Sequence, residues 1–215
     1  MVRRRYRLRF SKRGNLRFIG HRDLLRAIER LLRRASLPVA KSQGFHPKPR
    51  TSYLSALPLG FSSDDEAMEL ILEDDLPPEN LLERLNAVSV DGLEFLKAVP
   101  LEDGAPKQQP LAFAYDATVP EALLAGLREK IDSFMSAKSV EVVKPNGKPV
   151  EARAPVLELT LEGTELRVLL AAQSGPEAGL REILACLGLE KELFRTIFPN
   201  RTRSFIEDEG VRPSL

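Results

Sequence analysis

Hydrophobic and arginine side chains alternate between residues 5 and 11, and this period of two predicts a half-buried β-strand. The apolar side holds Tyr6, Leu8 and Phe10, and the other side holds Arg5, Arg7 and Arg9. The outer face of the strand is therefore expected to be a row of arginines.

Apolar residues recur with a helical period from His21 to Ala35, which predicts an amphipathic helix. The opposite face is basic and holds Arg22, Arg26, Arg30 and Arg33, with Glu29 among them. Gly20 or His21 lies at the N-cap position, and the Asp23 carboxylate in the first turn suits the helix dipole.

The rest of the first half predicts an extended segment at 51–59, a strand at 67–72, a helix that opens at 77–80 and a strand at 93–99. Asp64, Asp65 and Glu66 are interpreted as a solvated turn. The resulting order, β-α-β-β-α-β, is typical of ferredoxin-like folds, in which both helices cover one face of an antiparallel sheet.

Residues 101–110 are polar and rich in proline, which predicts a linker between a domain at 1–100 and a domain at 111–215. The second half approximately repeats the order of the first. Its expected elements are strands at 112–119, 139–144, 156–161, 165–172 and 203–207, helices at 120–137 and 177–187, and a hairpin turn at Asn146-Gly147. We therefore expect an α+β chain made of two tandem ferredoxin-like halves.

The segment Lys41–Arg50 reads KSQGFHPKPR and predicts a rigid loop. Pro47 and Pro49 remove backbone donors and fix φ, so neither a helix nor a central strand can contain them. Gly44 gives the backbone freedom to turn. Loops of this kind display side chains for function more often than they serve packing.

The formal net charge of +1 over 215 residues conceals a strong asymmetry. Residues 1–50 contain 16 lysines and arginines against two acids, whereas residues 51–110 contain three against 13. A basic quarter suggests an anionic partner, with nucleic acid the leading candidate. The alternatives are a solvated cationic face and internal pairing with the acidic segment 64–75.

Composition narrows the class of protein. No apolar run approaches the ~20 residues that span a bilayer, and no apolar segment follows the basic start, so we expect a cytoplasmic protein without a signal peptide or membrane partner. Cys186 is the single cysteine, which excludes an internal disulfide and an iron–sulfur cluster held by this chain alone. It lies in an apolar run, so we interpret it as a packing residue.

The candidate catalytic residues are His21, Asp23 and His46. Either histidine could act as acid or base near neutral pH, and with Asp23 they could form part of a metal site. Their spacing is not diagnostic of a metal, so we expect no metal and no cofactor. A hydrogen-bonding role for His21 and a helix-terminal role for Asp23 are the structural alternatives.

Phe45 lies among cations, a combination that suits base stacking together with phosphate contact. The alternative is that Phe45 fills the core and holds the loop in place. Gly44, Pro47 and Pro49 would shape the loop. The predicted nucleic-acid-binding residues are Arg7, Arg9, Arg22, Arg26, Arg33, Lys41, Phe45, Lys48 and Arg50.

Four motifs together resemble the radical-SAM-linked family, a bacterial domain of unknown function: FSKRG at 10–14, LRFIGHRD at 16–23, LPVAKSQGFHPKPR at 37–50 and LPLG at 57–60. The family is encoded beside, or fused to, radical SAM proteins, and often near genes for ribonuclease G and ribosomal proteins. The resemblance implies a radical SAM partner and a link to RNA. Many members carry Asn at the position of His46, which implies that this histidine is not a fixed catalytic base.

These observations lead to one hypothesis and two rivals. The leading hypothesis is a non-catalytic module that recognises tRNA or rRNA and presents it to a radical SAM protein. The first rival is an RNA-processing or RNA-modifying enzyme that uses His21 or His46. The second is a subunit that only docks an acidic protein partner.

Overall fold

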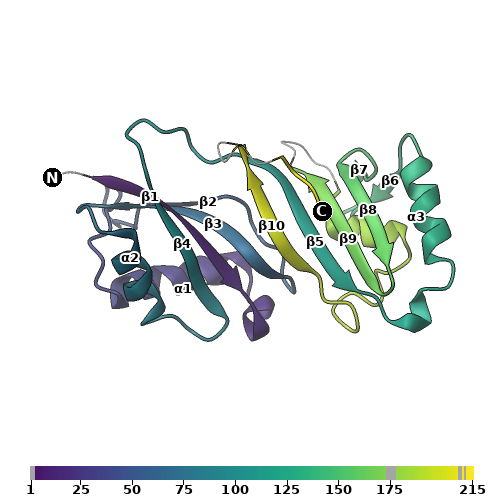
Figure 1. The fold of residues 1–215 in the computed structure, drawn as a ribbon, viewed down its shortest axis with the longest axis horizontal. Coiled ribbons are helices and arrows are strands. Elements are labelled where there is room, and N and C mark those ends of the chain that lie inside the picture. Colours follow the sequence, from purple (N-terminus) through teal and green to yellow (C-terminus); the bar gives the residue numbers. More distant parts are fainter. Residues whose placement is uncertain (1–2, 173–177, 208–209, 211) are drawn as a thin grey trace. The chain divides into compact units, whose positions relative to one another are not determined.

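The computed structural model describes residues 3–172, 178–207, 210 and 212–215. The fold is mixed α+β, and its strands pair largely antiparallel (Figure 1). The chain divides into two compact units, Met1–Gln108 and Gln109–Leu215, and each is considered by itself.

The first unit follows the order strand, helix, two strands, helix, strand. Its elements are β1 (Arg4–Lys12), the short 3-10 helix η1 (Gly14–Phe18), α1 (His21–Arg34), β2 (Thr51–Tyr53), β3 (Ser62–Leu72), α2 (Pro78–Asn86) and β4 (Leu93–Leu101). Strand β1 lies between β4 and β3, and β2 pairs with the other edge of β3, all antiparallel.

The core of this unit lies between the sheet and its two helices. The even-numbered side chains of β1 (Tyr6, Leu8 and Phe10) are fully buried against apolar residues of β3, β4, α1 and α2. Helix α1 contributes Leu24, Ile28, Leu31 and Leu32 from one stripe. Because the apolar stripe faces the sheet, the arginine-rich face of α1 remains outside, as the periodicity predicts.

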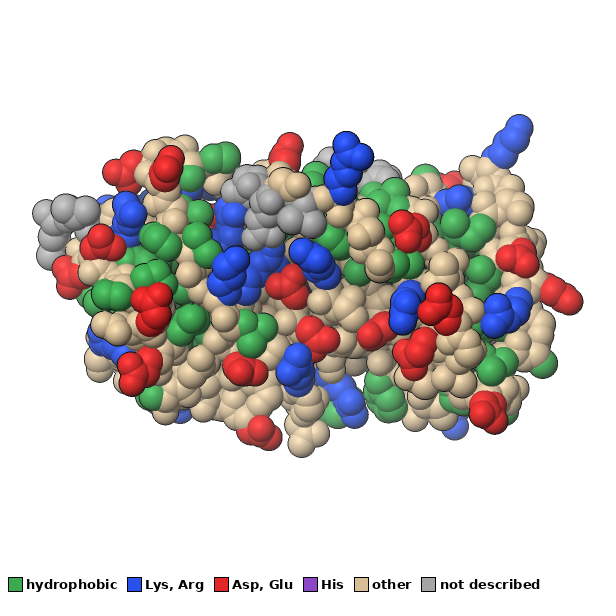
Figure 2. All heavy atoms as spheres, viewed as in Figure 1, with side chains coloured by type: hydrophobic (Ala, Val, Ile, Leu, Met, Phe, Trp, Pro, Cys, Tyr) green, Lys and Arg blue, Asp and Glu red, His purple; other side chains and the backbone are tan. Residues whose placement is uncertain are grey.

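Strand β3 is longer than predicted, since it begins at Ser62 and includes the acidic residues 64–66. The interpretation of these acids as a solvated turn is wrong. Glu66 is buried, and Asp65 accepts hydrogen bonds from Arg9 on the neighbouring strand. Cations on β1 compensate the acidic run, which lets it continue as a strand. On the face shown in Figure 2, acidic and basic side chains likewise lie interspersed.

The second unit contains β5 (Pro110–Thr118), the short 3-10 helix η2 (Glu121–Leu123), α3 (Leu127–Ser136), β6 (Glu141–Val143), β7 (Pro149–Glu151), β8 (Val156–Glu162), β9 (Glu165–Ala171), α4 (Leu180–Cys186) and β10 (Asn200–Ile206). Its strands lie in the order β10-β5-β9-β8. With β6 and β7 set aside as a separate hairpin, this is the order of β4-β1-β3-β2 in the first unit.

Two predicted elements of the second unit need correction. The single helix expected at 120–137 is broken, because Gly126 adopts a left-handed φ of 70° between η2 and α3. The strand at 139–144 shortens to β6 and pairs with β7 across the predicted hairpin turn at Asn146-Gly147, although β7 itself was not among the expected strands. Glu177, where the last helix was expected to begin, lies outside the described residues, and that helix runs from Leu180.

Candidate nucleic-acid interface

The segment 40–50 forms a hairpin whose base is held by β3. The Ala40 amide donates to the Ile71 carbonyl at 2.9 Å, and the Ile71 amide donates to the Arg50 carbonyl at 3.2 Å. Within the hairpin, the Arg50 amide donates to the Ala40 carbonyl at 2.7 Å, and the Ser42 amide donates to the Lys48 carbonyl at 2.8 Å. The base is therefore fixed in a sheet-like pattern, and residues 43–47 form the tip.

The tip of the hairpin presents Phe45 to solvent. The Phe45 side chain is fully exposed, at 101% of its reference area, so the interpretation of Phe45 as a core residue is wrong. Gly44 has a φ of 123°, a conformation that residues with a Cβ rarely adopt. The glycine thus permits the turn that displays the aromatic ring beside it.

Three hollows surround this hairpin, and most of the predicted binding cations line them. Arg22, Arg26 and Lys48 line a groove of about 260 Å³ against α1, which we call the α1 groove. Arg33 and Lys41 line a second hollow of about 290 Å³. Arg5, Arg50 and Lys107 line a third of about 420 Å³, together with Glu69.

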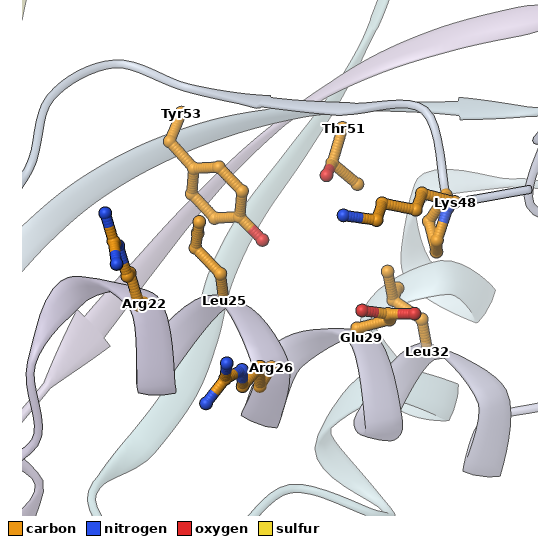
Figure 3. Close-up of a pocket in the computed structure, with 9 residues that line it drawn as sticks. Arg22, Leu25, Arg26, Glu29, Leu32, Lys48, Thr51 and Tyr53 are labelled. Carbon is orange, nitrogen blue, oxygen red and sulfur yellow. The ribbon is translucent and has the colours of Figure 1, made fainter. Parts of the chain in front are cut away.

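The α1 groove lies between one helix face and the strand that follows the hairpin (Figure 3). Tyr53, Thr51 and Lys48 extend from the hairpin and β2 toward α1, and the Glu29 carboxylate faces them from the helix. Leu25, Leu32 and Pro49 form the apolar part of the groove wall. The Arg26 guanidinium points away from Tyr53, which places this cation at the outer edge.

Tyr53 is held as a neutral phenol in this groove. Burial raises its pKa to about 12, the Thr51 side chain opposes that shift, and the Glu29 charge adds to it. The ring also packs edge-on against His21, with ring centroids 5.9 Å apart. The predicted nucleic-acid-binding residues did not include Tyr53, Thr51 or Glu29. The sequence did carry one signal for two of them, because residues 51 and 53 are two apart in an extended segment and therefore lie on the same side of it.

The cations around the hairpin differ in how they are compensated. Arg33 pairs with Glu29, and Arg26 lies 3.4 Å from Asp23, both on exposed helix surface. The side chains of Arg22, Lys41, Lys48 and Arg50 form no ion pair or hydrogen bond within the part of the chain that the structure describes. Their charges are available to an anionic ligand.

Arg7 and Arg9 do not belong to this cluster, although both were predicted to bind nucleic acid. Arg7 donates to Glu69 at 3.0 Å, and both side chains are buried. Arg9 contacts both carboxylate oxygens of Asp65, at 3.1 and 3.2 Å. These arginines compensate acids of β3, so we leave them out of the interface.

The candidate catalytic residues do not form an acid–base arrangement. His21 begins α1 against Tyr53, and Asp23 lies beside Arg26. His46 is exposed at the hairpin tip, and within the described residues its side chain makes no hydrogen bond. A general base is normally oriented by a partner within hydrogen-bond reach, so the histidines give the enzyme hypothesis no support.

The described residues give little support to metal binding, cysteine catalysis or membrane insertion. They contain no group of three or more His, Cys, Asp or Glu side chains that could hold a metal ion. Burial raises the pKa of the Cys186 thiol, which makes this cysteine a poor nucleophile. Across the same ranges, every helix is too short or too polar to cross a bilayer.

Comparison with known proteins identifies the family. The chain belongs to a family described as "Uncharacterized protein conserved in bacteria (DUF2344)", whose model matches residues 5–181. No curated protein matches the chain.

Two solved structures resemble the fold. The first, a Cbf5-Nop10-Gar1 complex, has a TM-score of 0.48 and 15% identity over 95% of this chain. The second, an H/ACA RNP bound to a substrate RNA containing 2'-deoxyuridine, has a TM-score of 0.43 and 14% identity over 96% of this chain. In both cases the chain spans 50% of the length of the protein it resembles. Likeness at this level says nothing about what the present chain binds.

Proposed function

We propose that the first unit binds single-stranded RNA through the hairpin 40–50 and the hollows beside it. The observation that carries this proposal is the fully exposed Phe45 ring next to cations that form no ion pair among the described residues. An exposed aromatic ring beside cations is the combination that binds single-stranded nucleic acid, with a base stacked on the ring. The neighbouring lysines and arginines would bind the phosphates on either side of that base.

An unpaired strand suits this surface better than a duplex does. Bases in an A-form helix are stacked on each other, and its deep major groove is closed to side chains, so a protruding phenyl ring has no base face to contact. In a single strand every base offers a face, and stacking tolerates any sequence. The hairpin therefore supplies general affinity for RNA, and selectivity would have to come from a neighbouring subsite.

The wider role is proposed from the family resemblance. We infer a cytoplasmic module, encoded with or joined to a radical SAM protein, that presents RNA to that partner. We also class both units as tandem ferredoxin-like halves that meet in the 101–110 linker; the supporting observation is the shared strand order. Co-purification of the chain with a neighbouring radical SAM protein in the presence of nuclease tests the partnership, which fails if no such protein is retained.

RNA binding is tested by titrating the protein with a fluorescent single-stranded RNA of mixed sequence at several salt concentrations. We expect the logarithm of the affinity to fall linearly with the logarithm of salt, with a slope of about −0.7 for each phosphate bound. Arg22→Glu combined with Lys48→Glu should weaken binding at least about tenfold, since two attractive contacts become repulsive.

The matched control is Lys138→Glu combined with Lys191→Glu, which makes the same charge change on exposed lysines of the second unit. This control should bind RNA within about twofold of the wild-type protein, because salt screens surface charges that do not contact the RNA. If both double variants lose the same amount of RNA affinity, the loss is caused by the change in net charge and the groove has no special role. Absence of binding at low salt would overturn the proposal.

A further inference from the structure

The α1 groove contains a feature that phosphate binding does not explain. Of the described residues that line it, Glu29 alone is acidic, and its carboxylate faces the groove between Lys48 and the Tyr53 side chain (Figure 3). A carboxylate repels a phosphate, so its presence argues for a neutral ligand group at this point. Arg33 pairs with Glu29 from the next helical turn and fixes its position.

The groove combines an apolar wall with polar groups, as ligand sites for small molecules do. Leu25, Leu32 and Pro49 present apolar surface, and Glu29, Thr51 and Tyr53 add polar groups beside the cations of the groove. Its volume of about 260 Å³ lies just below the range of about 300–1,000 Å³ for drug-sized ligands, so it suits a single base better than a longer ligand. Arg22 and Lys48 lie on the same groove, where they can contact flanking phosphates.

We propose that the α1 groove is a nucleotide subsite that accepts one unpaired guanine, whose N1–H and N2–H₂ groups donate to the Glu29 carboxylate. An ionised carboxylate only accepts hydrogen bonds, and its two oxygens match two adjacent N–H donors. Guanine alone among the four bases presents two adjacent donors on its Watson–Crick edge. Adenine and cytosine place an acceptor beside the amino group, and uracil places its N–H between two carbonyls.

The remaining groups of the groove fit the same ligand. Guanine O6 is an acceptor, and Lys48 Nζ and the neutral Tyr53 hydroxyl are donors in the same groove. The subsite rests on the proposed function, because it requires an RNA strand that the hairpin already holds. It adds selectivity, since a wrong base would place an acceptor, or only one donor, against the Glu29 carboxylate.

A purely structural role for Glu29 is the competing explanation. In this explanation Glu29 serves only to pair with Arg33 on the next helical turn. An exposed ion pair at i and i+4 contributes about 0.3–0.5 kcal/mol to helix stability. That role predicts no dependence on the base. The two explanations are therefore separated by changing the RNA, with the protein left intact.

The experiment compares uridine oligomers of one length that carry a single central G, A, C, U or inosine. Inosine keeps N1–H and O6 but lacks the 2-amino group. We expect wild-type protein to bind the G oligomer at least about tenfold more tightly than the others, with inosine the best of the rest. Glu29→Gln, which introduces an amide donor at the acceptor position, should bind all five within about threefold.

Glu79→Gln on the exposed surface of α2 is the matched control and should keep the wild-type preference for G. Equal binding of the five oligomers by wild-type protein would overturn the guanine subsite and leave RNA binding by the hairpin intact. A G preference that survives in Glu29→Gln would also overturn it. Failure of every oligomer to bind would remove the proposed function and the subsite together.

Discussion

Two groups of cations in the first unit share a stretch of fifty residues but serve different purposes. The arginines of β1 face acids of β3, where Arg7 lies opposite Glu69 in register and bonds to it. The cations of α1 and the hairpin lie on exposed surface, and several have no partner in the described part of the chain. Positive charge in a sequence therefore indicates a ligand only after internal partners have been assigned.

The difference follows from the position of each element. Strand β1 is central in its unit and lies beside β3, so its outward side chains meet those of a neighbouring strand. Helix α1 covers the other face of the sheet and directs its polar side to solvent. The base of the hairpin pairs with β3, and among the described residues of this unit no further strand pairs with its tip.

The largest effect is expected for the arginines of β1 that pair with acids of β3, and it is an effect on stability. Arg7→Ala would leave the buried Glu69 carboxylate with Arg5, whose nearest nitrogen is 3.9 Å away. Loss of one member of a buried pair should lower the free energy of unfolding by about 3–5 kcal/mol. Urea denaturation measures this change, and RNA affinity of the folded variant should stay within about twofold of wild type.

A double replacement sharpens this prediction. Arg7→Met combined with Glu69→Leu removes both charges and should restore most of the stability, to within about 2 kcal/mol of wild type. If Arg7→Ala instead leaves stability unchanged and weakens RNA binding more than about tenfold, the arginines of β1 belong to the interface and the comparison fails.

An intermediate effect is expected at the hairpin tip. Phe45→Ala should weaken RNA binding by about 1–3 kcal/mol, the range measured for stacking of one base on one aromatic ring. The melting temperature should not change, because the side chain is fully exposed. Phe18→Ala, at a second exposed phenylalanine of the same unit, provides the control and should bind RNA normally. Equal affinities for Phe45→Ala and wild type would contradict a stacking role.

A last effect concerns Tyr53 and appears only under alkaline conditions. The folded protein holds the phenol proton with a pKa of about 12, whereas the unfolded chain releases it near 10.0. Stability is therefore fully present below about pH 10 and falls as pH rises through about 12. Urea denaturation across this range should show a steeper decline for wild type than for Tyr53→Phe, which lacks the ionisable group. Identical declines would show that Tyr53 is not buried in solution.

Several features could be predicted from sequence because they depend on local spacing. The alternation of Tyr6, Leu8 and Phe10 and the apolar stripe of α1 gave the correct elements and the faces that meet the core. The prediction that β1 is only half-buried is wrong, because its arginine side is also buried from Arg7 onward. Pro47, Pro49 and Gly44 likewise identified an ordered loop without a helix. These signals reside in neighbouring residues, so no knowledge of the tertiary structure was needed.

Other features depend on residues far apart in the chain and could not be predicted. The acids at 64–66 join β3 because arginines some fifty residues earlier lie beside them. Glu29 and Tyr53 form one groove because a hairpin brings β2 over α1, and neither residue has a distinctive neighbour in sequence. The break at Gly126 reflects one glycine φ inside an otherwise helical pattern.

The sequence by itself determined where the cations of the first unit lie along the chain and which faces of its elements carry them. The tertiary structure decided which of those cations are compensated, because compensation depends on the strand or helix that lies opposite in space. It also decided that Phe45 is exposed, since a hairpin beyond the edge of β3 has no core to bury the ring. Periodicity specifies a face, and only packing specifies what covers it.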